Sequence, residues 1–194
     1  MKVRVTMVEG GPGDGAAPFV RERVQPTLRS AEGCEGLIAL KTDDGRGMSI
    51  ALWRDDQAMQ GSEDVAASLR AEAEEQGYRP EVMGRYTCDL VDVHGGDAQA
   101  ARFVRWSGSG DVAQVVRDKV VPSYGQLDGF SGLCVFSDER GGIGVSLWAS
   151  RTAIDNARDT TGQLGGWLEE AGLTLDSVET CDVTLCDVSQ TAHA

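Results

Sequence analysis

Short stretches in which apolar and polar residues alternate predict strands, and longer stretches with apolar residues every three or four positions predict helices. In the first half of the chain, these patterns predict strands at 2–8, 36–41, 48–53 and 85–93, and helices at 17–31 and 62–76. An acidic, glycine-containing turn joins the two middle strands, and Gly77 ends the second helix. The predicted order is therefore β-α-β-β-α-β.

The second half repeats this order, with strands predicted at 101–106, 133–137, 143–148 and 179–188, and helices at 112–124 and from a cap at Ser150 to Ala171. A proline lies inside the first helix of each half, where it should kink or end the helix. In each half Gly-x-x-Gly-Leu then leads into the second strand, and the third strand, after the acidic turn, ends in Leu-Trp. Such internal similarity indicates duplicated architecture. We expect repeats at 1–93 and 100–188, a linker at 94–99 and a frayed tail at 189–194.

The doubling has a consequence for packing. A β-α-β-β-α-β unit closes into a four-stranded antiparallel sheet with both helices on one face, the ferredoxin-like arrangement. The other face of the sheet is then apolar and uncovered, which is unstable in an isolated unit. The predicted fold is α+β: tandem ferredoxin-like repeats that pack sheet to sheet as a pseudo-dimeric α+β barrel within one chain.

Composition narrows the classes of partner. The 194 residues carry a net charge of −13, which argues against nucleic acid and against an anionic membrane surface. The N-terminal segment has no apolar run long enough for a signal peptide or a spanning helix. The five cysteines form no C-x-x-C pair, and the two histidines create no zinc-site spacing, so no metal site is predicted. Free cysteines suit a reduced cytoplasmic setting.

Two motifs resemble a known family. The helix proline followed by Gly-x-x-Gly-Leu, and the Trp-x-[Ser/Asp] that ends the third strand, are similar to the antibiotic biosynthesis monooxygenase-like domains of the dimeric α+β barrel superfamily. The resemblance spans nearly the whole chain, as two fused copies in place of the usual homodimer. It implies a pocket between sheet and helices in which an aromatic substrate is oxidised without a metal or an organic cofactor. Members of this superfamily differ in function, so the motifs indicate fold more than chemistry.

The haem-degrading branch of the superfamily is disfavoured. The resemblance would require an asparagine in the first strand, and a histidine on the helix after the third strand. The chain has no asparagine at 1–8 or 101–106, and no histidine on either such helix.

Five aromatic side chains are candidates for the wall of a substrate pocket: Trp53, Tyr86, Trp106, Tyr124 and Trp148. The tryptophan that ends the third strand occurs in both copies, which also suits a core residue closing the strand. Trp106 and Tyr124 align with Gly10 and Leu28, so a site kept in only one half is expected in the second copy. Core packing remains the alternative for each of these residues.

No catalytic residue is identified. His94 in the linker and His193 in the tail are expected to be solvated, and Cys88 and Cys186 have no nearby base to lower their pKa. Two functions therefore stay open. One is a small-molecule-binding, cofactor-independent monooxygenase-like protein acting on an aromatic or polyketide-like substrate. The other is a non-catalytic α+β barrel that serves as a ligand-binding or protein-interaction scaffold. Further homodimerisation of the fused pair is open as well.

Overall fold

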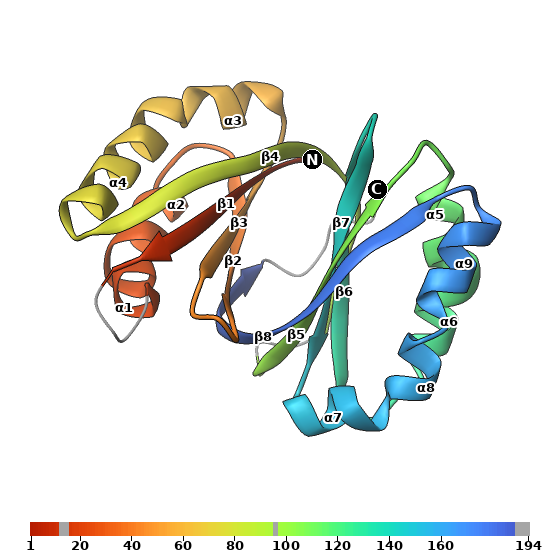
Figure 1. Ribbon diagram of the computed structural model, residues 1–194. Coiled ribbons are helices and arrows are strands. Elements are labelled where there is room, and N and C mark those ends of the chain that lie inside the picture. The colour runs from red at the N-terminus through yellow and green to blue at the C-terminus, as the bar shows by residue number, and fades with distance from the viewer. Residues whose placement is uncertain (12–15, 95–96, 189–194) are drawn as a thin grey trace. The chain divides into compact units, whose positions relative to one another are not determined.

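The computed structural model describes residues 1–11, 16–94 and 97–188, and within them the strands and helices follow the predicted order (Figure 1). The first half contains β1 (Lys2–Gly10), α1 (Ala17–Phe19), η1 (Val20–Val24), α2 (Gln25–Arg29), β2 (Cys34–Thr42), β3 (Gly47–Trp53), α3 (Asp56–Gly61), α4 (Glu63–Glu75) and β4 (Tyr78–Val93). The second half contains β5 (Ala100–Ser107), α5 (Val112–Val115), η2 (Val116–Val120), α6 (Val121–Tyr124), β6 (Phe130–Asp138), β7 (Gly141–Trp148), α7 (Arg151–Asn156), α8 (Arg158–Thr161), α9 (Leu164–Glu170) and β8 (Thr174–Val188). The predicted tail, with His193, lies outside the described residues.

The strands are hydrogen-bonded in the closed order β1-β3-β2-β8-β5-β7-β6-β4, which confirms the predicted α+β barrel fold. Among the described residues, 1–87 and 182–188 form one compact unit, and 88–181 form another. We call these the first unit and the second unit. The long strands β4 and β8 therefore each belong to both units. The second part of each strand, 88–93 in β4 and 182–188 in β8, belongs to the unit of the other repeat.

Strand pairing gives each residue of β1 a definite face. β1 lies between β3 and β4 and pairs antiparallel with both. Val3 and Val5 are fully buried on the face away from the helices. Arg4, Thr6 and Val8 alternate with them and face the helices of the same unit. In both units the helices cover one face of the strands (Figure 1).

The two prolines at matched positions of the repeats disturb their helices in the same way. Pro26 and Pro122 each follow a five-residue π-helical segment, Val20–Val24 and Val116–Val120. Proline has no N–H to donate, and its ring crowds the carbonyl four residues earlier. A π-helical turn widens the helix locally and accommodates both defects. The helix therefore continues past the proline to Arg29 in the first unit and to Tyr124 in the second.

The largest departures from the predicted elements are in β4, in β8 and in the last helix. β4 begins at Tyr78 and β8 at Thr174, so both strands are longer than predicted. The helix predicted from Ser150 to Ala171 is divided into α7, α8 and α9, in a region where glycines at 162, 165 and 166 weaken a continuous helix. The predicted cap at Ser150 is present, because its Oγ accepts from the backbone N–H of Ala153 at 3.1 Å, and Asp55 caps α3 in the same way, accepting from the backbone N–H of Ala58 at 2.8 Å.

Candidate functional site

The first unit contains a cavity of about 80 Å³ between its helices and the helix-facing side of β1, β2 and β3. Its walls are mostly apolar and include Phe19 and Val20 from the first helix, Ala51 from β3, and Leu69 from α4. Its charged lining residues are Arg4, Lys41 and Arg70. No aspartate, glutamate or histidine lines it among the described residues. The cavity thus combines apolar walls with a purely cationic set of charges.

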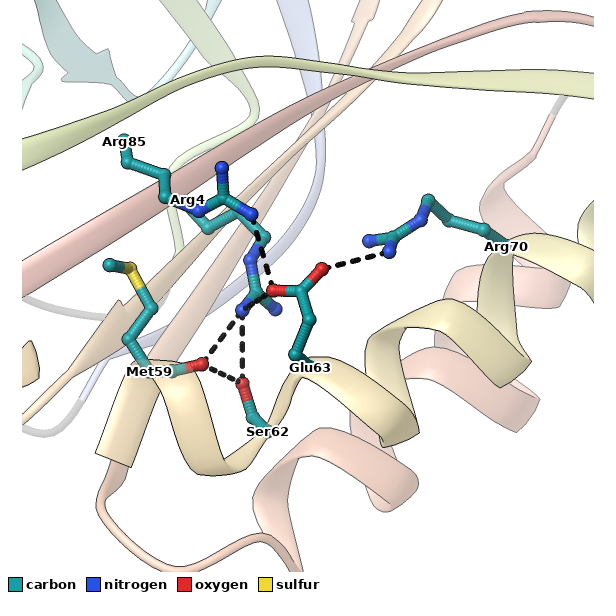
Figure 2. A network of polar contacts seen from close by, with 6 residues as sticks. All are labelled: Arg4, Met59, Ser62, Glu63, Arg70 and Arg85. Carbon is teal, nitrogen blue, oxygen red and sulfur yellow. Dashed lines mark hydrogen bonds and ion pairs between the residues drawn. The ribbon is translucent and has the colours of Figure 1, made fainter. Parts of the chain in front are cut away.

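Arg4 is held at one side of this cavity by a network of polar contacts (Figure 2). The side chain of Arg4 is only 4% exposed. Its Nη2 donates to the carbonyl oxygen of Met59 at 2.8 Å and to Glu63 Oε2 at 2.8 Å. A longer contact of 3.2 Å joins Nη2 to Ser62 Oγ. The network is built by the junction of α3 and α4, which presents the Met59 carbonyl, Ser62 and Glu63 to β1.

Glu63 is shared among three guanidinium groups. In addition to Arg4, Arg70 donates to Glu63 Oε1 at 2.9 Å and Arg85 to Glu63 Oε2 at 3.3 Å. Burial alone would raise the pKa of Glu63, but the hydrogen bond from Arg70 and the charge of Arg4 outweigh it and lower this pKa. Burial also lowers the pKa of Arg4, against the charge of Glu63. One carboxylate facing three guanidinium groups leaves this cluster with excess positive charge.

Two N–H donors beside the network have no partner. Within the described residues, no acceptor lies within hydrogen-bonding distance of Arg4 Nε or of Trp53 Nε1, and both atoms are buried. The guanidinium carbon of Arg4 lies 5.7 Å from the centre of the Trp53 ring, so the two side chains are neighbours. Buried donors without partners are rare in folded proteins and need a specific explanation.

The second unit has a smaller cavity of about 40 Å³ in the corresponding place. Trp106 occupies this region, and its ring lies across β7, where a β-carbon added at Gly142 would come within 2.5 Å of Cζ2 and one added at Gly144 within 3.4 Å of Cζ3. Strand pairing places Val8 of the first unit at the position of Trp106, because Val8 pairs with Gly47 as Trp106 pairs with Gly142. The alignment of Trp106 with Gly10 was therefore wrong by two residues.

The structure separates the five predicted aromatic residues. Trp106 and Tyr124 line the smaller cavity, whereas Trp53 and Trp148 are fully buried in the cores and Tyr86 is half-buried on β4. Trp148, Tyr124 and Phe130 form a cluster with ring centres 5.4 to 6.0 Å apart. Burial raises the pKa of the Tyr124 hydroxyl to about 12, although the charge of Arg102 acts in the opposite direction. This phenol is therefore neutral at physiological pH.

Arg4 was not among the residues predicted from the sequence, because only the apolar residues of its strand define the pattern. A signal was present, since an arginine recurs at matched positions of the two first strands, Arg4 opposite Ala51 and Arg102 opposite Ser146. A charged residue on an inward face of a strand is seldom fully buried unless it has a partner. That pattern points to a buried polar network, although it does not show which unit keeps a cavity.

Other chemical groups are less suited to catalysis. All five cysteines are free thiols, and burial raises the pKa of Cys88 to about 11 and that of Cys186 in the same direction. His94 is exposed, as predicted, with Nε2 at 3.1 Å from Asp92 Oδ1. The described residues contain no group of three or more His, Cys, Asp or Glu side chains placed to hold a metal ion. Nor do they include a helix long and apolar enough to cross a membrane.

Comparison with known proteins identifies the fold. No protein-family model matches the chain, and no curated protein matches its sequence. A proposed monooxygenase from Lactobacillus acidophilus NCFM superimposes with a TM-score of 0.66 at 9% identity, covering 97% of each chain. A proposed monooxygenase from Fusobacterium nucleatum gives 0.65 at 9% identity, covering 97% of this chain and 92% of that one. An anthrone oxidase-like protein gives 0.61 at 10% identity, covering 98% and 94%.

At such low identity these similarities establish the fold and leave the chemistry to the residues of the site. The chain shares the fold of these proteins, an α+β arrangement in which the strands of both repeats close into one eight-stranded barrel.

Proposed function

We propose that the chain binds an aromatic small molecule in the cavity of the first unit and oxidises it with O2, without a metal or an organic cofactor. The observation that carries this proposal is the cavity itself, which lies between sheet and helices and has apolar walls. Apolar enclosures with a few placed polar groups are typical of small-molecule sites. The proposal differs from the sequence-based expectation in its location, which was the second copy.

The cavity residues suit a substrate that reacts as an anion. Apolar walls exclude water and hold the ring, while the cationic lining residues stabilise negative charge on a substrate oxygen. In such a reaction the electrons come from the substrate anion. An activated CH2 group and one O2 give a carbonyl group and one water, so that no external reductant is consumed. The protein's contribution is to orient the substrate and to favour its ionised form.

A second function is supported by a specific observation. Among the described residues, neither a histidine nor a carboxylate lines the cavity, so a bound molecule meets no imidazole or carboxylate that could act as general base. A ligand-binding protein without turnover needs no such base. Binding at this cavity is common to both functions, and turnover separates them.

The test uses a variant that fills the cavity as the second unit fills its own. Val8→Trp with Ser49→Gly reproduces the arrangement of Trp106 over Gly144, and Gly47 already matches Gly142. Anthrone is the probe, with O2 consumption followed at an electrode and ligand binding by thermal shift. We expect the wild-type protein to bind anthrone and consume O2, and the filled variant to do neither.

The wild-type protein could bind anthrone without consuming O2, while the filled variant does not bind it. That result would reject the monooxygenase and support the ligand-binding protein. Equal binding by both proteins would reject the cavity as the site. The control is Ser137→Ala on β6 of the second unit, a half-buried residue outside the lining of either cavity, which should change neither measurement.

A further inference from the structure

We infer that the ligand of this cavity is an aromatic carboxylic acid, bound as its carboxylate beside Ala51 by the N–H donors of Arg4 and Trp53. This inference rests on the proposed function, because it assumes that the cavity of the first unit is a binding site. It adds the chemical class of the ligand and the atoms that recognise it.

The first observation is the pair of unpartnered donors. The hydrogen bonds that hold Arg4 all use Nη2, and its Nε–H has no acceptor among the described residues. The indole N–H of Trp53 has none either, and the whole side chain is inaccessible to solvent. Both donors are fixed by the packing around them, so an acceptor brought by a ligand would meet a site that is already formed.

The second observation is that both donors border one position of β3. Ala51 is the direct cross-strand partner of Arg4, and it lies two residues before Trp53 on the same face of the strand. Ala51 also lines the cavity. Arg4 lines the cavity as well, whereas Trp53 does not, so we place the carboxylate at the methyl group of Ala51, with one oxygen toward each donor.

The third observation comes from the second unit, where a side chain supplies the missing oxygen. Trp148 Nε1 donates to Ser146 Oγ at 2.9 Å, and Ser146 pairs across the strands with Arg102. Ser146 and Ala51 hold the same place in the two copies. The first unit thus lacks a hydroxyl oxygen where the second unit has one, and it has a cavity at that place.

Charge and shape favour a carboxylate over other acceptors. The lining cations and the excess of guanidinium groups around Glu63 give this part of an acidic chain a local positive charge. Two separate donors suit the two oxygens of a carboxylate, which also forms stronger hydrogen bonds than a neutral acceptor. The apolar walls suit an aromatic ring and offer nothing to a strongly hydrated anion such as inorganic phosphate.

The experiment compares 2-naphthoate with 2-naphthamide, which has the same ring and nearly the same shape but no charge. Calorimetric titration of the full chain at neutral pH should give a dissociation constant at least tenfold lower for the acid. Ala51→Ser places a hydroxyl beside Trp53 as in the second unit, and should weaken 2-naphthoate binding at least tenfold while changing 2-naphthamide binding less than threefold. Ser146→Ala is the matched control and should leave both constants unchanged.

The outcomes separate this inference from the proposed function. If both probes bind with equal affinity and Ala51→Ser changes neither, the inference of a carboxylate ligand is overturned. The proposal that the cavity binds an aromatic molecule would then still stand. Binding of neither probe, or binding that Ser146→Ala weakens and Ala51→Ser does not, would overturn the inference and the location of the site together. Arg4→Lys keeps the charge but removes Nε–H, and its failure to weaken 2-naphthoate binding would exclude Arg4 as a donor.

Discussion

The indole N–H of Trp148 donates to the hydroxyl oxygen of Ser146, two residues earlier on the same strand, at 2.9 Å. Trp53 occupies the matched position of the first unit and finds Ala51 where Ser146 stands, so its N–H has no acceptor among the described residues. Two copies of one architecture therefore differ in how they satisfy a buried donor. The second unit satisfies it internally, and the first leaves it beside a cavity.

This difference predicts opposite effects on stability for two reciprocal substitutions. Ser146→Ala should lower the free energy of unfolding by about 1–3 kcal/mol, because it leaves the buried N–H of Trp148 without an acceptor. Ala51→Ser should raise it by about 0.5–1.5 kcal/mol, because it gives Trp53 the acceptor it lacks. Urea denaturation of both variants would measure the changes. A loss of stability in Ala51→Ser as large as in Ser146→Ala would contradict this explanation.

The Arg4 network predicts that its two partners differ in their effect on stability. Glu63→Gln should cost about 3 kcal/mol, because it removes the nearest compensating charge from the buried guanidinium of Arg4. Arg4→Met should cost at most about 1 kcal/mol, because Glu63 keeps Arg70 and Arg85 as partners and remains partly exposed to solvent. Denaturant unfolding of both variants measures this order, and the reverse order would show that the side chain of Arg4 contributes more to stability than the compensating charge of Glu63.

The same network predicts a dependence of stability on pH. The pKa of Glu63 is held below its ordinary value of 4.5, since the effect of burial, which raises it, is outweighed by contacts with Arg70 and Arg4. Its ionised form therefore stabilises the fold above pH 4.5, and this contribution is lost as the pH falls through the lower, folded-state pKa. The difference in unfolding free energy between wild type and Glu63→Gln should be constant near neutral pH and shrink in acid. A difference that does not change with pH would reject the coupling.

Trp106 provides a test of how the second unit closes its cavity. Trp106→Val installs the residue found at the matched position of the first unit and should cost about 3 kcal/mol through lost burial and the cavity left behind. Thermal unfolding would detect this loss. A change below about 1 kcal/mol would mean that the strands and helices collapse into the space instead.

Much of the fold followed from local patterns. The period of the apolar residues, the recurring proline and the Leu-Trp endings predicted the element order, the duplication and the barrel. The crossing of β4 and β8 between the units was not predictable, because alternation along a strand says which face a residue takes but not which partner strand it meets. The division of the last helix was not predicted, because its apolar spacing favours one continuous helix, whereas the glycines at 162, 165 and 166 weaken it.

The site was harder to predict from the sequence. The aromatic residues of the second copy suggested a pocket there, and the structure places Trp148, Tyr124 and Phe130 in contact with one another as part of a core. The cavity of the first unit arises from what that copy lacks, with Val8 in place of Trp106 and Leu28 in place of Tyr124. Smaller side chains leave a cavity only where the surrounding strands and helices do not move together to fill the space. Whether they do depends on the packing of the whole unit, which the sequence pattern does not show.

The most direct test of the central claim is a titration followed by the indole N–H resonances of the four tryptophans in a 1H–15N correlation spectrum. The resonance of Trp53, assigned with Trp53→Phe, should move downfield as 2-naphthoate is added, because its N–H gains a charged acceptor. The resonance of Trp148 should stay in place, because Ser146 already occupies that N–H. Movement of Trp148 or Trp106 with Trp53 unchanged would place the ligand in the second unit and contradict a binding site at Arg4 and Trp53.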